Sequence, residues 1–115
     1  MDIQLCDAET NPDLKIMRLS GRLDVIGAQE LDPKILDAVA KCKSGLIVNM
    51  EGVDFVSSAG LRTILTARKE AESAGKPLAL VHVRPLVYKI FKIAVLDKVF
   101  QFFEEEADAI QALSS

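Results

Sequence analysis

Two short apolar runs, separated by one amphipathic stretch, constrain this chain most. Residues 46–50 (LIVNM) and 78–83 (LALVHV) are mostly apolar, which is typical of strands that are covered on both faces. Between them, residues 58–74 carry apolar side chains at helical spacing, and Gly75 and Pro77 end the pattern. A strand, a helix and a second strand in this order predict a right-handed parallel crossover, so we expect an α/β fold.

A hairpin is predicted before this unit. Residues 2–7 and residues 14–19 alternate between apolar and polar side chains, as half-exposed strands do, and Asn11-Pro12-Asp13 between them is a turn signal. Gly21 then gives the backbone freedom for a sharp bend into Arg22-Leu23-Asp24.

A helix is predicted over residues 27–41, where apolar side chains recur at helical spacing. Lys43-Ser44-Gly45 is expected to end it, with the glycine as the C-cap. Pro33 complicates the pattern because proline lacks an amide donor and is best tolerated in a first turn. Either Asp32 caps a helix that begins at Pro33, with residues 27–31 as a separate turn, or these residues form a kinked lead-in. The pattern leaves both open.

The C-terminal part predicts three further elements. A helix follows Pro85, with Val87, Ile90, Phe91 and Ala94 on one side; residues 99–103 form a short strand; and Ala107, Ile110 and Leu113 mark a terminal helix. We therefore expect one domain over residues 1–115, with a mixed sheet of four or five strands and helices packed mainly on one side.

Composition excludes several classes of function. The chain has 115 residues and a net charge of −3, with no basic run, which argues against a nucleic-acid partner. It has neither a signal peptide nor a run of about 18 apolar residues, so we predict a cytoplasmic protein without membrane insertion. Cys6 and Cys42 lie far apart, without a second cysteine or histidine nearby, so we expect idle thiols and no metal or cofactor site.

The candidate site lies in residues 53–65 (VDFVSSAGLRTIL), where two serines precede a helical pattern. Either Ser57 or Ser58 can cap the helix by accepting hydrogen bonds from its first amides. The amides and the macrodipole at a helix start favour negative charge, so a phosphate on a serine there is tolerated by the fold while it changes the surface sharply.

The sequence does not match the residue spacing of two common enzyme motifs. A nucleophile elbow needs glycines two residues either side of the serine; Gly60 satisfies one side of Ser58, but Val56 occupies the other. The one histidine, His82, lies near the end of an apolar strand. A phosphate-binding loop fails because Gly75-Lys76 is followed by proline instead of Ser or Thr. We therefore do not expect an enzyme.

The serine stretch resembles the signature of STAS domains, the family of anti-sigma factor antagonists and sulphate-transporter tails. Their pattern, Asp-Ser-Ser/Thr-Gly-Leu-Gly, is matched here by residues 57–62, with Ser57 in place of the acid, Ala59 in place of the second hydroxyl residue and Arg62 in place of the last glycine. Residues 20–24 resemble the family's Gly-x-Leu-Asp turn. Residues 86–100 resemble its late helix and Leu-Asp-x-x-Phe ending.

The resemblance implies a protein–protein switch. By position Ser58 matches the serine that family kinases phosphorylate, with Ser57 as second choice. The family's partner contacts correspond to Asp24, Ser57, Ser58, Gly60, Leu61 and Arg62. The implied partners are an anti-sigma factor serine kinase, which binds the unphosphorylated protein and releases it after phosphorylation, and a serine phosphatase that resets the cycle.

Two alternatives remain from the sequence. The chain could be a STAS subunit of a transporter or a stress-sensing assembly, in which the same helix face is a permanent docking surface without a phosphorylation cycle. It could also bind a small anion in a nest formed by the serine loop.

Overall fold

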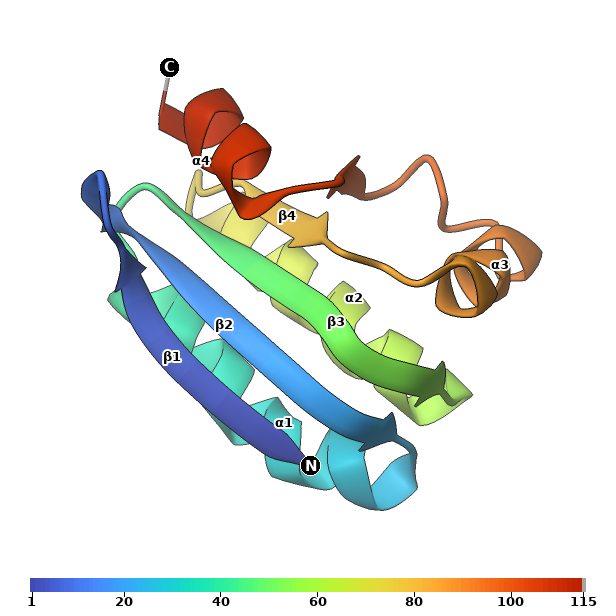
Figure 1. Ribbon diagram of the computed structural model, residues 1–115. Helices are drawn as coiled ribbons and strands as arrows, with labels where there is room; N and C mark the ends of the chain where they lie inside the picture. The colour runs from blue at the N-terminus through green and yellow to red at the C-terminus, as the bar shows by residue number, and fades with distance from the viewer. Residues whose placement is uncertain (115) are drawn as a thin grey trace.

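One five-stranded sheet and four helices make up residues 1–114, the part of the chain that this computed structural model describes (Figure 1). The strands lie side by side in sequence order. β1 is antiparallel to β2, and the other neighbours are parallel, so the predicted mixed sheet and both sequence-predicted connections, the hairpin and the crossover, are confirmed. The elements are β1 (Asp2–Ala8), β2 (Asn11–Leu23), α1 (Val25–Lys41), β3 (Gly45–Val56), α2 (Ser58–Ser73), β4 (Leu78–Val81), α3 (Pro85–Ile93), β5 (Gln101–Phe103) and α4 (Glu106–Ser114).

Helices cover both faces of the sheet unequally. α1 and α2 lie behind it and α4 lies in front, near one end (Figure 1). Because side chains alternate along a strand, Met17 and Val48 join the core beneath α1, α2 and α3, whereas Ile16 and Ile47 join a smaller core beneath α4. The prediction that helices pack mainly on one side is confirmed, with α4 on the other.

β2 and β3 are longer than the apolar runs suggested. The sheet register shifts beside Gly21, whose φ is +114°, because β3 has one extra residue, Asp54, between the partners of Gly21 and Arg22. β2 itself continues through the predicted bend to Leu23. β3 likewise continues beyond residue 50 to Val56. The predicted turn at residues 11–13 is wrong: the chain turns at residues 9–10, and Asn11 already pairs with Ala8 in the hairpin.

α1 runs unbroken through Pro33, so residues 27–31 belong to the helix and are not a separate turn. Pro33 removes the amide that would bond to the carbonyl of Gln29, but both residues are exposed, so water can reach the freed group. The predicted glycine C-cap is wrong too. α1 is capped by Cys42 in an extended conformation, and Gly45 begins β3.

Both thiols are free, Cys6 on the surface and Cys42 in the core, where burial raises the pKa of the Cys42 thiol. In residues 1–114, no cluster of three or more His, Cys, Asp or Glu side chains could hold a metal ion. Within the same range, no helix is both long enough and apolar enough to cross a membrane.

Candidate partner-binding site

The ends of β2 and β3 bring two helix starts together. Leu23 and Val56 are the last residues of these parallel strands and face each other in the register. The next residue in each case is a helix N-cap, Asp24 for α1 and Ser57 for α2. Because parallel strands end at the same edge of a sheet, the sheet topology places the two caps side by side.

Ser57 is fully engaged in this junction. Its Oγ accepts a hydrogen bond from the Gly60 amide at 3.2 Å and donates one to the Leu23 carbonyl at 3.1 Å. The Ser57 amide donates to the same carbonyl at 2.9 Å. The structural work of an N-cap, which the sequence allowed for either serine, therefore falls on Ser57.

Ser58 is the first residue of α2, and its side chain is exposed. Its hydroxyl makes no hydrogen bond to any residue in the described range 1–114. An added phosphate would therefore break no hydrogen bond within residues 1–114. It would also lie at the positive end of the α2 dipole, where backbone amides and an anion attract each other.

Gly60 has a packing function at the same junction. A Cβ atom there would lie 2.6 Å from Leu23 Cγ and 2.7 Å from the Leu23 carbonyl oxygen, so only glycine lets α2 approach β2 this closely. Leu61 is half-buried against the main core, and Asp24 is held by its cap bond to the Gly27 amide at 2.8 Å. Of the six predicted contact residues, these three and Ser57 therefore have structural contacts within the domain.

Arg62 and Ser58 form the exposed face of this helix start. Arg62 is exposed and lies four residues after Ser58, so the two side chains share one face of α2. A guanidinium one turn away is within reach of a phosphate on Ser58 or of an acidic group on a partner.

Sequence reasoning missed two apolar side chains beside this face. Val25 and Ile26, in the first turn of α1, are 57% and 68% exposed. Nearby, the Arg22 guanidinium stacks 4.3 Å from the centre of the Phe55 ring. The available signal was a pair of large apolar residues directly after the Asp24 cap. Exposed apolar groups rimmed by polar ones are characteristic of protein-binding surfaces.

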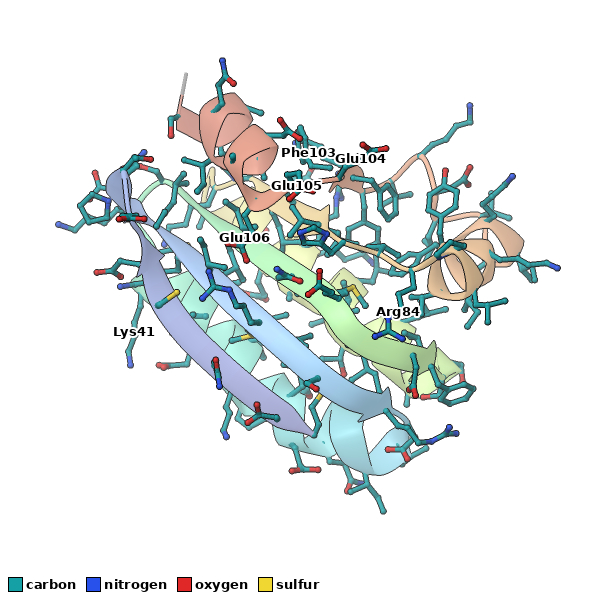
Figure 2. All side chains as sticks on the ribbon, in the orientation of Figure 1. Lys41, Arg84, Phe103, Glu104, Glu105 and Glu106 are labelled. Atoms are coloured by element: carbon teal, nitrogen blue, oxygen red, sulfur yellow. The ribbon has the colours of Figure 1, made fainter. Side chains whose placement is uncertain are left out.

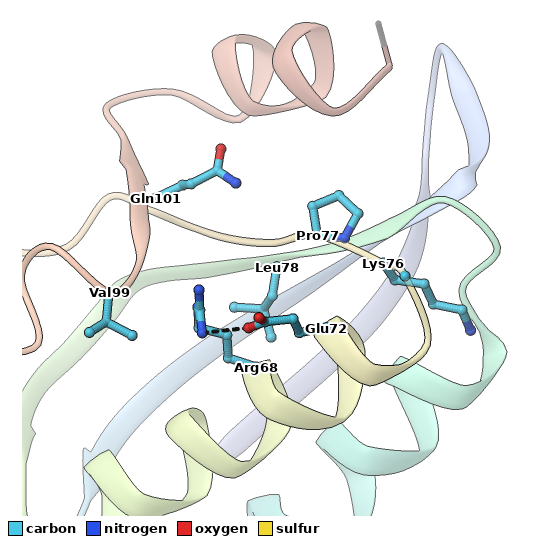
Figure 3. A pocket seen from close by; sticks show the side chains of 8 residues that line it. Arg68, Glu72, Lys76, Pro77, Leu78, Val99 and Gln101 are labelled. Atoms are coloured by element: carbon cyan, nitrogen blue, oxygen red, sulfur yellow. Dashed lines mark hydrogen bonds and ion pairs between the residues drawn. The ribbon is translucent and has the colours of Figure 1, made fainter.

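A cavity of about 300 Å³ lies at the other end of α2, away from Ser58 (Figure 3). Its cationic groups already have partners. Arg68 pairs with Glu72 at 2.8 Å, and the Lys76 ammonium donates to the Val39 carbonyl of α1 at 2.9 Å. The cavity therefore offers no free charge with which to bind a ligand.

A network of polar side chains connects α4 to the front face of the sheet. Glu106, at the start of α4, lies over the front face of the sheet (Figure 2). Arg18 forms a two-bond pair with Glu106, at 2.9 and 2.8 Å, and Asn49 donates to the same carboxylate at 2.6 Å. The bonds from Arg18, followed by that from Asn49, lower the pKa of Glu106. This network fixes the start of α4 on the sheet.

Comparison with known proteins gives a consistent family. The sequence model of the STAS domain matches residues 6–109. A curated relative from Paenibacillus polymyxa, an anti-sigma F factor antagonist, is 25% identical over 115 residues, which cover 98% of this chain and 97% of the relative.

Solved structures share the fold. A putative anti-sigma factor antagonist from Thermotoga maritima has a TM-score of 0.88 at 18% identity, covering 98% of this chain and 95% of that one. The anti-sigma factor antagonist SpoIIAA in its unphosphorylated form has a TM-score of 0.75 at 22% identity, covering 99% of both chains. The phosphorylated form of SpoIIAA from Bacillus has a TM-score of 0.72 at 24% identity, covering 97% of this chain and 99% of that one.

Proposed function

The chain belongs to the STAS domain family, and from that premise we propose that it is an anti-sigma factor antagonist controlled by phosphorylation of Ser58. In this proposal the unphosphorylated protein binds a kinase-like anti-sigma factor and thereby frees a sigma factor. The bound partner then phosphorylates Ser58 and the complex dissociates. A serine phosphatase restores the starting state.

The comparisons support the proposal at the level of the family. The relative from Paenibacillus polymyxa, matched over nearly its whole length, is an anti-sigma F factor antagonist. SpoIIAA, which shares the fold, exists in an unphosphorylated and a phosphorylated form. A fold that accommodates both forms is what a phosphorylation switch requires.

We choose Ser58 over Ser57 as the phosphorylated residue because the two hydroxyl groups have different environments. Ser57 uses its hydroxyl as both donor and acceptor inside the junction, whereas the Ser58 hydroxyl is exposed and without a partner among residues 1–114. A kinase can reach Ser58 without opening the fold. Phosphorylation of Ser57 would break the cap of α2 and its bond to β2.

The transfer itself needs no chemistry from this chain beyond a nucleophile. The Ser58 Oγ attacks the γ-phosphorus of ATP, the bond to the β-phosphate oxygen breaks, and ADP leaves. The hydroxyl proton passes to a base on the kinase. The chain contributes an accessible oxygen and, through the start of α2, an environment that stabilises the anionic product.

The release step follows from the surface around Ser58. In the unphosphorylated protein, the exposed Val25 and Ile26 provide apolar area for a partner, and Arg62 provides a charged contact. A phosphate adds nearly two negative charges, which must be desolvated or repelled in any interface that covers Ser58. Weakening a complex 100-fold requires about 2.7 kcal/mol, which such an uncompensated charge can supply.

The experiment that tests the proposal is phosphorylation by the cognate anti-sigma factor kinase, followed by peptide mapping. Wild type and Ser57→Ala should each gain one phosphate on Ser58, and Ser58→Ala should gain none. Modification of Ser57 alone, or no modification with an authentic partner that binds the protein, contradicts the assignment. Binding without phosphorylation would instead favour a permanent STAS subunit of a larger assembly.

A further inference from the structure

The outward face of α3 carries an apolar stripe that nothing in the described chain covers. Leu86 and Ile93 are each 74% exposed, and the half-buried Ile90 lies between them at helical spacing. The inward face of α3 is made by Val87 and Phe91, both fully buried. α3 lies at the edge of the domain, beyond the end of β4 (Figure 1). The helix is therefore apolar on two sides, and only one side serves the core.

A further exposed apolar side chain, Val95, follows the end of α3. Its backbone conformation is one that β-branched residues rarely adopt. The helix ends with the Val95 amide bonded to the Lys92 carbonyl at 3.0 Å and the Leu96 amide bonded to the Phe91 carbonyl at 2.8 Å. In this termination motif the residue at position 95 adopts a left-handed conformation, and glycine is the usual choice. Here a β-branched valine with φ +59° takes that place and is 78% exposed. The chain tolerates backbone strain where it presents an apolar side chain to solvent.

The stripe is flanked by positive charge. Residues 84–98 contain four basic residues against one acidic residue, a net charge of +3 within a chain whose total is −3. Lys89 is three residues after Leu86 and four before Ile93, so it adjoins the stripe directly. Lys89, Lys92 and Lys98 form no ion pair within residues 1–114. The surface is a convex apolar ridge with unpaired cations at its side.

We propose that this ridge, defined by Leu86, Ile93, Val95, Lys89 and Lys92, docks the protein on an anionic lipid surface. The three apolar side chains enter the boundary between headgroups and acyl chains, and the two ammonium groups contact lipid phosphates. The docking is peripheral, because a nine-residue helix is far too short to span a bilayer.

Two features favour lipid over an acidic groove on another protein. The apolar groups lie on an outward ridge, which fits a soft planar surface without a preformed cleft. The segment also has a net charge of +3, with Asp97 as its one acidic residue, and a positive surface is attracted to anionic lipid headgroups. The alternative occupant is an acidic protein, and the experiment below distinguishes the two.

The test is co-sedimentation of the full chain with vesicles. One set contains phosphatidylcholine alone, and the other contains phosphatidylcholine with a third as much phosphatidylglycerol. We expect binding to the anionic vesicles only, and loss of binding at about 1 M salt, where the Debye length is about 3 Å. Lys89→Glu with Lys92→Glu should weaken binding about 25-fold or more, from about fivefold for each lost lysine near an anionic surface.

Apolar variants separate this surface from general stickiness. Ile93→Gln should reduce binding to anionic vesicles, whereas Ile26→Gln, at a similarly exposed position on α1, should leave it unchanged. Val95→Gly is the sharpest variant: it relieves the left-handed strain, so it should raise the melting temperature while it weakens vesicle binding.

Three results would overturn the proposal. These are no sedimentation with anionic vesicles at low salt, equal binding to both vesicle types, and binding that Ile93→Gln leaves intact. The first result, together with capture of a purified acidic partner that Ile93→Gln abolishes, would assign the ridge to protein instead. None of these outcomes depends on phosphorylation of Ser58, so this inference can fail while the proposed switch stands.

Discussion

The Ser57 hydroxyl donates a hydrogen bond to the Leu23 carbonyl oxygen, 3.1 Å away, and thereby joins the start of α2 to the end of β2. The same carbonyl also accepts from the Ser57 amide at 2.9 Å. This contact fixes the position of the α2 N-terminus relative to that of α1. It also explains why the neighbouring serine is the one left available for modification.

Replacing the two serines should separate structure from regulation. Ser57→Ala removes an N-cap and a bond to Leu23, so it should lower the free energy of unfolding by about 1–2 kcal/mol. Ser58→Ala removes an exposed hydroxyl and should change it by less than about 0.5 kcal/mol. Urea denaturation of both variants measures this. Equal destabilisation by the two substitutions would show that the cap is wrongly assigned.

Gly60→Ala should destabilise the protein, although alanine normally stabilises a helix by about 1 kcal/mol relative to glycine. The new methyl group would lie 2.6 Å from Leu23 Cγ and 2.7 Å from the Leu23 carbonyl oxygen, so α2 must move away from β2. A loss of about 1–3 kcal/mol is expected, measured by denaturation. Thr66→Ala, at an exposed position of α2, is the control and should be neutral or slightly stabilising. A Gly60→Ala protein as stable as wild type would refute the close approach.

The Glu106 carboxylate predicts a pH dependence of stability. Its bonds from Arg18 and Asn49 hold the pKa of Glu106 below its ordinary value of 4.5. Since the folded state favours the charged form, this stabilisation is present above about pH 4.5 and is lost as the pH falls through the lowered pKa. Glu106→Gln should therefore cost about 1 kcal/mol at pH 7, and its difference from wild type should shrink in acid.

Chemical denaturation from pH 7 down to about pH 3 gives the curve for each protein. Glu70→Gln, at an exposed position of α2, serves as the matched carboxylate control and should run parallel to wild type. A Glu106→Gln difference that stays constant with pH would show that the carboxylate charge does not contribute.

Val25 and Ile26 should matter for binding and not for folding. Ile26→Ser removes an apolar side chain that is 68% exposed, so the melting temperature should stay near that of wild type. Titration calorimetry with the cognate anti-sigma factor should show binding weakened about fivefold or more, the equivalent of about 1 kcal/mol. Ile93→Ser, on α3, should leave this affinity unchanged. If Ile26→Ser binds like wild type, the partner does not cover the start of α1.

Much of the fold could be predicted because its signals are periodic and local. The hairpin, the parallel crossover and the extent of α2 follow from alternation, helical spacing and the Gly75 and Pro77 stop signals. The conformation of residues 27–31 was left open because Pro33 suggested a helix start. Only the exposure of Gln29 and Pro33 in the structure shows that water can reach the carbonyl that lacks its amide donor. The sequence did not predict the second half of β3. The length of this strand depends on its pairing with β2 beyond a bulge, and such pairing is non-local.

The candidate site was predictable in type and less so in detail. Two adjacent serines before an apolar stripe indicate a helix start, but propensity cannot say which of them caps it. That choice depends on the Leu23 carbonyl, 34 residues away from Ser57 in the chain. The exposure of Ile26 and Ile93 was also hidden, because periodicity marks residues as apolar without showing whether another element covers them.

The phosphomimetic substitution Ser58→Asp tests whether a negative charge at position 58 weakens partner binding without disturbing the fold. An acidic residue in the first turn of α2 favours the helix dipole, so the circular dichroism spectrum and melting temperature should stay near those of wild type. Binding to the anti-sigma factor should weaken. Loss of folding instead would mean that Ser58 has a structural function.

The most direct measurement is the dissociation constant of the complex with the cognate anti-sigma factor kinase, for the unphosphorylated protein and for protein phosphorylated on Ser58 alone. The account predicts that the phosphate weakens the complex about 100-fold or more, a difference of about 2.7 kcal/mol, while the fold stays intact. Equal affinities for the two forms would contradict it.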